Sequence, residues 1–226
     1  MISSSDTTLF VADVCGTLVR DDTTLGLLAH HFSQQPKRQW RLQFLRLMTA
    51  RLSPFRLAVG LLERVTGKHI LKRVLVRMLN KDTVHSLESS AKSYAQWLLA
   101  ERTVTSVWDV LTPAIQEHRV VLASASLQPI VSALAEQLGI KYVASELESQ
   151  KGVLTGCYKN DLTGLKIQAL SALIGTDLKK QKYHAISDNL TDRELLDGAQ
   201  KAFVVLHHEL HRKRWTGLSA TYLRFN

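Results

Sequence analysis

The sequence predicts an α/β protein: a Rossmann-like parallel sheet core with an all-helical cap domain inserted after the first strand. Two observations support this prediction. Short apolar runs, typical of buried strands, alternate with amphipathic helical patterns beyond residue 104. Residues 22–103 contain helical patterns alone. We therefore expect a core formed by residues 1–21 and 104–226, and a helical cap formed by residues 22–103.

The core elements follow in a regular order. The first strand is predicted at residues 9–14, where an apolar run leads to Gly16. Further strands are predicted at 120–123, 141–144, 183–186 and 202–206, and helices at 128–138, 165–174 and 192–199. The helix at 128–138 carries apolar side chains on one face and stops at Gly139. Residues 152–158 predict a hairpin at the sheet edge.

The helices of the insert are predicted from apolar spacing and capping residues. Trp40, Phe44, Leu47 and Met48 are expected to share one helix face. A second helix is expected between Ser53-Pro54, an N-cap followed by proline, and the stop signal Thr66-Gly67. Two more are expected at 70–78 and, with Asp82 as its N-cap, at 82–98.

Composition restricts the class of protein. With 226 residues, 45% hydrophobic and 22% charged, the chain is globular in character. Two cysteines, Cys15 and Cys157, do not form a disulfide framework, so we expect reduced thiols in a cytoplasmic protein. The first residues lack signal-peptide character, and no apolar run reaches the ~20 residues that span a bilayer.

The net charge of +9 is concentrated in the insert. Residues 36–81 contain twelve Lys and Arg and one Glu, which gives +11 and leaves −2 for the rest of the chain. Three interpretations stay open: a solvated helical surface, recognition of an anionic substrate, or peripheral contact with an anionic membrane. Arginines among apolar residues at 40–48 and 55–62 fit a membrane interface, and they equally fit packing within the cap. Without an RNA- or DNA-binding motif, we expect no nucleic acid partner.

Chemically active side chains follow the predicted strands at four places. Ligands of open α/β sheets gather at the carboxyl ends of the strands, so we expect these side chains to meet. A carboxylate can attack phosphorus, Mg²⁺ held by carboxylates can neutralise the phosphate, and a hydroxyl and an ammonium can hold its other oxygens. The four places are Asp13 with Gly16-Thr17, Ser124-Ala125-Ser126, Lys166, and Asp188 with Asp192.

These four segments, in this order, resemble motifs one to four of the haloacid dehalogenase-like (HAD) hydrolase superfamily. The tracts at 122–129 and 187–192 are similar to those of its phosphoserine-phosphatase-like branch. The insert after the first motif resembles, by position, the helical cap of that branch. The resemblance covers essentially the whole chain.

The resemblance implies a Mg²⁺-dependent phosphomonoester phosphatase or phosphotransferase acting through an aspartyl phosphate, on a small or lipid-linked substrate. Asp13 would be the nucleophile and a metal ligand, and the backbone carbonyl of Cys15 a further ligand. Asp188 would bind Mg²⁺, and Asp192 would bind it or support its ligands. The expected substrate-binding residues are Ser124, Ala125, Lys166 and the cap residue Asp22.

Cys15 departs from the family pattern, which has an Asp there as general acid and base. Such help is typically worth ~10²–10⁴-fold in rate. Three consequences are open. The enzyme is slow or needs a substrate with a good leaving group, or His30 or His31 in the cap supplies the proton. Otherwise hydrolysis is not its physiological task. A catalytically weak phosphate-binding protein is the alternative. Cys15 itself is either a redox-active thiol or a small tolerated residue.

The histidines near the end of the sequence carry no metal prediction. His207, His208 and His211 stand beside the basic run 212–214. This pattern predicts a solvated helix rather than a metal site.

Overall fold

A computed structural model describes residues 8–50 and 70–226. The helix expected between Ser53-Pro54 and Thr66-Gly67, the pattern at 55–62 and the first six residues lie outside this described part. Within it, no helix has both the length and the apolar character that crossing a bilayer requires.

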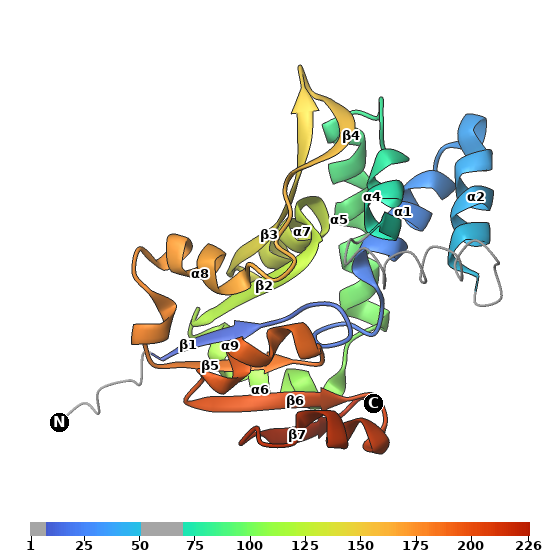
Figure 1. The fold of residues 1–226 in the computed structure, drawn as a ribbon. Helices are drawn as coiled ribbons and strands as arrows, with labels where there is room; N and C mark the ends of the chain where they lie inside the picture. The colour runs from blue at the N-terminus through green and yellow to red at the C-terminus, as the bar shows by residue number, and fades with distance from the viewer. Residues whose placement is uncertain (1–7, 51–69) are drawn as a thin grey trace.

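A seven-stranded sheet forms the centre of the molecule (Figure 1). Its order is β4-β3-β2-β1-β5-β6-β7, and every pair is parallel except β3 with β4. β1 therefore lies in the middle, between β2 and β5, which brings the ends of three strands together. The strands are Leu9–Ala12, Val120–Leu127, Lys141–Gln150, Val153–Asn160, Tyr183–Ser187, Lys201–Leu206 and Thr221–Arg224.

Helices cover both faces of the sheet because the central strands are apolar on both sides. Phe10 and Ala12 face a cluster that includes α6 (Thr105–Gln116) and α7 (Gln128–Leu138). Val11, between them, faces a second cluster with α8 (Lys166–Ile174) and α9 (Arg193–Asp197). The predicted α/β class with a largely parallel sheet is confirmed.

The insert between β1 and β2 contains α1 (Thr23–Ser33), α2 (Gln39–Thr49), α4 (Ile70–Arg77) and α5 (Val84–Glu101). Its buried side chains, such as Leu27, Phe32 and Leu98, belong to the same hydrophobic cluster as Phe10 of β1. α5 packs along α7, and the β3–β4 hairpin extends beside α4 (Figure 1). The insert therefore shares the hydrophobic core of the sheet.

Several local predictions need correction. The hairpin turn lies at Lys151-Gly152, so 152–158 forms most of one strand, and Gly156 lets β4 approach Arg77 of α4 closely. Thr83, not Asp82, caps α5 through the N–H of Ser86. On α2 the buried face carries Arg41, Leu45 and Met48, whereas Trp40, Phe44 and Leu47 are exposed. α6 and β7 have no counterpart among the predicted elements.

Candidate active site

Asp13 directly follows the central strand β1. Its backbone N–H donates to the carbonyl of Ile186 in β5 at 3.0 Å, and its side chain is buried. The turn that follows passes through Gly16 at a φ of +67°, where a Cβ would overlap the carboxylate of Asp188. A glycine is therefore required for the ends of β1 and β5 to bring these two carboxylates together.

Lys166, the first residue of α8, joins two of the predicted aspartates. Its Nζ donates to Asp13 Oδ1 at 2.7 Å and to Asp192 Oδ2 at 2.6 Å, and Ser187 Oγ also donates to Asp192 Oδ2 at 2.7 Å. Burial opposes the charge of Lys166, but Asp13 and Asp192 outweigh it and raise its pKa. Lys166 is therefore a fixed cation beside Asp13.

Asp188 is linked to Asp13 through a shared contact with Thr17. The hydroxyl of Thr17 is 3.1 Å from Asp188 Oδ1 and 3.4 Å from Asp13 Oδ2, so both carboxylates meet at one side chain. His207 Nε2 contacts Asp188 Oδ2 at 2.8 Å, and its ring stacks on Phe225. His207 and His208 are exposed, as predicted for this stretch, but the contact of His207 with Asp188 was not predicted; it arises because β6 ends beside β5.

The site holds more negative than positive charge. Burial raises the pKa of Asp13 to about 7, against the effect of Lys166, and Asp192 and Asp188 raise it further. Burial also raises the pKa of Asp188, despite its contacts with His207 and Thr17. Carboxylates crowded in a buried space become fully ionised when a cation joins them.

Asp13 and Asp188 are the carboxylates that fit a magnesium ion. In the described part of the chain, no three His, Cys, Asp or Glu side chains are arranged to hold a metal. Asp192 Oδ2 accepts from Lys166 and Ser187, which fits the predicted alternative that this residue supports the metal ligands. Mg²⁺ commonly uses one or two carboxylates and fills its shell with water and phosphate oxygens.

Cys15 lies among hydrogen-bond donors. Its Sγ is 2.8 Å from Thr23 Oγ1 and 3.0 Å from Ser126 Oγ, and it accepts from the Thr23 N–H at 3.3 Å. Burial, with Asp22 and Asp13, raises the pKa of the thiol to about 11. The protein groups around Cys15 therefore favour the neutral thiol.

A hollow of about 380 Å³ opens over these groups. The core lines it with Asp13, Cys15, Ser124, Ala125 and Lys166, which are residues that the sequence analysis proposed for the site. The insert contributes Asp22, Leu25, Leu71, Lys72 and Leu75. Asp22 uses Oδ1 to cap α1 through the N–H groups of Thr24 and Leu25, so its role is at least partly structural.

Lys72 is a site residue that the sequence analysis missed. From α4 it donates to Asp161 Oδ1 at 2.6 Å and to Thr163 Oγ1 at 2.8 Å, in the loop before Lys166. Ser145 links this loop to the second motif, because its Oγ donates to the carbonyl of Ala125 and accepts from the N–H of Leu162. In the sequence, Lys72 is one of twelve basic residues and nothing distinguishes it.

The two histidines considered as proton donors lie elsewhere. His31 is buried against Ser90 and Asp82, and His30 contacts Ser93 and stacks on Tyr94. Neither is among the described residues that line the hollow. They therefore do not replace the missing acid in this conformation.

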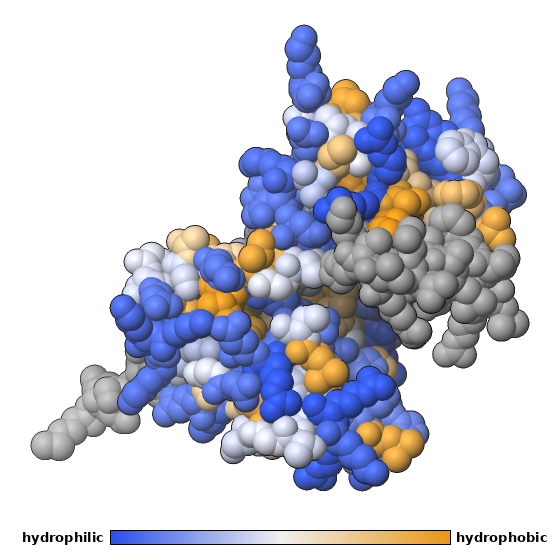
Figure 2. Space-filling model, viewed as in Figure 1, coloured by the Kyte–Doolittle hydropathy of each residue, from blue (hydrophilic) through white to orange (hydrophobic). Residues whose placement is uncertain are grey.

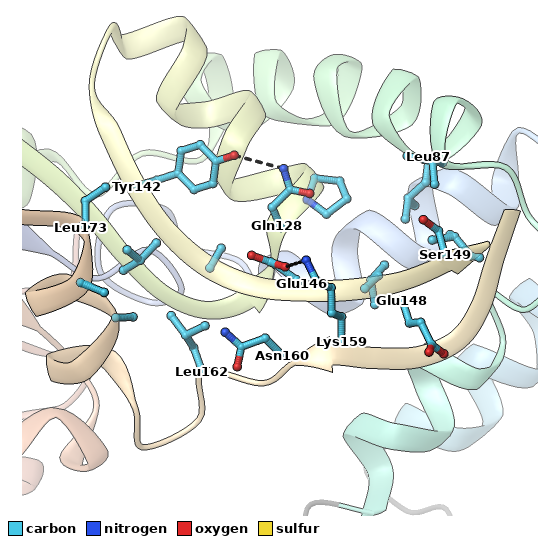
Figure 3. Close-up of a pocket in the computed structure, with 18 residues that line it drawn as sticks. Leu87, Gln128, Tyr142, Glu146, Glu148, Ser149, Lys159, Asn160, Leu162 and Leu173 are labelled. Carbon is cyan, nitrogen blue, oxygen red and sulfur yellow. Dashed lines mark hydrogen bonds and ion pairs between the residues drawn. The ribbon is translucent and has the colours of Figure 1, made fainter. Parts of the chain in front are cut away.

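A second, larger hollow of about 830 Å³ lies along the β3–β4 hairpin (Figure 3). Its lining includes Glu146, which is paired with Lys159 at 2.8 Å, and Gln128, which donates to Tyr142. None of the residues in the Asp13 cluster reaches it. Size alone therefore does not mark the active site, and the smaller hollow with its excess charge is the candidate.

Comparison with known proteins agrees with this location. A family model described as haloacid dehalogenase-like hydrolase matches residues 10–197, a range that contains all four motifs. A search of curated proteins found no match.

Solved structures show a similar fold. A protein of unknown function from Bordetella pertussis Tohama I is 16% identical, with a TM-score of 0.67 over 95% of this chain and 97% of its own. An apo phosphoserine phosphatase is 15% identical, with a TM-score of 0.58 over 97% and 94%. Cytosolic 5′-nucleotidase IIIB bound to cytidine is 15% identical, with a TM-score of 0.56 over 96% and 80%. At these identities the likeness establishes the fold alone.

Proposed function

Since the chain belongs to the haloacid dehalogenase-like hydrolase family, we propose that it is a Mg²⁺-dependent phosphomonoester hydrolase that acts through an aspartyl phosphate on Asp13. The observation that carries the proposal is the arrangement around Asp13. This carboxylate lies at the floor of the hollow, 2.7 Å from the ammonium of Lys166, with Ser124 in the same lining. A nucleophile and two phosphate-binding groups therefore converge on one place.

Each residue then has a chemical role. The Asp13 carboxylate attacks phosphorus, and the bond between phosphorus and the leaving oxygen breaks. Lys166 and the Ser124 hydroxyl hold the phosphoryl oxygens while charge moves onto them. Asp13 and Asp188 would hold Mg²⁺, with the Cys15 carbonyl as the expected third protein ligand, and the ion would supply charge neutralisation.

Cys15 limits the second half of the reaction. Hydrolysis of the aspartyl phosphate needs a base for water, and a neutral thiol is a poor one. The surroundings of Sγ consist of the Thr23 N–H and two hydroxyls. These groups can donate to a carboxylate equally well. An aspartate at this position would therefore be satisfied, which makes Cys15→Asp an informative variant.

The lining of the hollow favours a leaving group with an apolar part. Leu25, Leu71 and Leu75 come from the insert, above the groups that would hold the phosphate. The charged insert residues in the lining, Asp22 and Lys72, already have partners. A lipid-linked or other partly apolar phosphomonoester fits this lining better than a small, highly charged one.

A panel of phosphomonoesters, measured for phosphate release with and without Mg²⁺, tests the proposal. Asp13→Asn should abolish turnover, and Asp109→Asn, at an exposed carboxylate on α6, should leave it unchanged. Cys15→Asp should raise turnover by up to ~10²–10⁴-fold. Turnover that survives Asp13→Asn would contradict the mechanism.

The alternative, a weak phosphate-binding protein, predicts a different pattern. Phosphate with Mg²⁺ would raise the melting temperature of the wild type while only Cys15→Asp releases phosphate. That result would mean that the native chain binds phosphate and does not turn over substrate.

A further inference from the structure

The outer face of α2 is apolar and exposed. Trp40, Phe44 and Leu47 lie at positions i, i+4 and i+7, so they share one side of the helix. Their exposed fractions are 61%, 38% and 61%, and among the described large hydrophobic residues only Leu210 is more exposed than Trp40 and Leu47. A neighbouring side of the helix, with Leu45 and Met48, is buried in the insert. Within the described part of the chain, α2 therefore has one buried and one exposed apolar side.

Basic residues are close to this outer face in the sequence. Lys37, in the turn before α2, and Arg46, within it, are both exposed. α2 contains no acidic residue, and residues 36–81 carry +11 while the rest of the chain carries −2. Most of the surface seen in Figure 2 is hydrophilic, and hydrophobic side chains gather in a few areas that include the insert. Aromatic and aliphatic side chains flanked by Lys and Arg are the composition of interfacial helices.

We propose that this outer face of α2 (Trp40, Phe44 and Leu47), with Lys37 and Arg46 near it, docks on the surface of an anionic lipid bilayer. The apolar side chains would enter the boundary between headgroups and acyl chains, where Trp is favoured. The basic side chains would face the anionic headgroups. A second copy of the chain fits less well, because pairing two such faces brings like charges together.

The position of α2 connects docking with the candidate site. α2 packs on α1 (Figure 1), and the N-cap residue Asp22 and Leu25 in the first turn of α1 line the hollow. The insert therefore carries both the proposed docking helix α2 and part of the lining of the hollow. Docking stands without the proposed function, because it depends on surface contacts and not on turnover.

Vesicle co-sedimentation of the full chain tests the docking proposal. Wild type should bind vesicles of equal parts phosphatidylglycerol and phosphatidylcholine and should not bind pure phosphatidylcholine. Added salt should weaken binding, because it screens the basic side chains. A failure to bind the anionic vesicles would overturn the proposal whatever the catalytic result.

Matched variants locate the contact. The double variant Trp40→Ser/Leu47→Ser should lower binding by roughly tenfold or more. The control Leu210→Ser removes an apolar side chain that is 68% exposed and also stands near a basic run, and it should leave binding unchanged. Equal losses of vesicle binding in the double variant and in Leu210→Ser would overturn the assignment of the contact to α2. Thermal unfolding of each variant verifies that it folds.

Two further results would favour other partners and overturn the proposal. One is a dimer, measured by light scattering, that the double variant converts to a monomer. The other is binding to a DNA duplex that loses affinity in the double variant while vesicle binding does not change.

Discussion

Two buried carboxylates, Asp13 below the hollow and Asp82 in the insert, have opposite surroundings. Asp82 is held by Arg41 at 2.7 Å, by Arg38 and by His31 at 3.3 Å. Burial raises its pKa, but hydrogen bonds from His31 and Arg41 outweigh burial and lower it. Asp13 has one cation, Lys166, which it shares with Asp192, and its pKa is raised to about 7.

The difference separates a structural cluster from a candidate active site. Around Asp82, positive partners match or exceed the negative charge, so the cluster is complete and can hold α2 against the start of α5. Around Asp13, the described carboxylates outnumber the cations, so a ligand that brings positive charge would complete the cluster. A buried ion pair alone therefore does not indicate function, whereas a buried imbalance of charge does.

Asp13→Asn should produce the largest change, and it should be a change in activity. Removal of the nucleophile should lower phosphate release by more than about 10³-fold. Stability should not fall, because Lys166 keeps Asp192 and the crowding of carboxylates is relieved. Phosphate release at fixed times measures activity, and urea unfolding measures stability. If Asp13→Asn lost as much stability as Asp82→Asn, the two clusters would not differ in their contribution to stability.

Asp82→Asn should produce the largest loss of stability. It leaves the buried guanidinium of Arg41 without its counter-charge, which typically costs about 3–5 kcal/mol. Urea unfolding compares it with Asp109→Asn, an exposed control that should change stability by less than about 0.5 kcal/mol. An unchanged unfolding free energy would show that the Asp82 cluster does not hold the insert.

Lys72→Met should have an intermediate effect that links the two regions. Lys72 joins α4 to the loop carrying Asp161 and Thr163, close to Lys166. Its loss should lower kcat/KM by about tenfold while stability changes little, because the pair is partly exposed. Steady-state kinetics checks this, with Lys92→Met, which breaks an exposed pair with Glu136, as the control. If Lys72→Met and Lys92→Met changed kcat/KM equally, Lys72 would have no specific role at the site.

The smallest effect concerns acid stability. The folded pKa of Asp82 lies below its ordinary value of 3.8, so its contribution is present above that value and is lost as pH falls through the folded pKa. The free energy of unfolding of the wild type should therefore decrease below about pH 4 more steeply than that of Asp82→Asn. Parallel curves would mean that Asp82 titrates equally in the folded and unfolded chains.

Much of the sheet and the central residues could be predicted because their signals are local. A buried strand that ends in Asp13 and Gly16-Thr17, and a helix that begins at Lys166, are visible in short stretches of sequence. The family model and the fold agree with that analysis. β7 was not predicted, because it is short and half-exposed and gives little periodic signal.

The sequence by itself determined the fold class, the carboxylate that begins the site and the positive charge of the insert. The tertiary structure alone decided which partner each side chain takes. It pairs Asp192 with Lys166, His207 with Asp188, Lys72 with Asp161 and Asp82 with Arg41. These partners lie 19 to 89 residues apart in the chain. Local periodicity cannot encode such contacts, because the packing of separate elements brings them together.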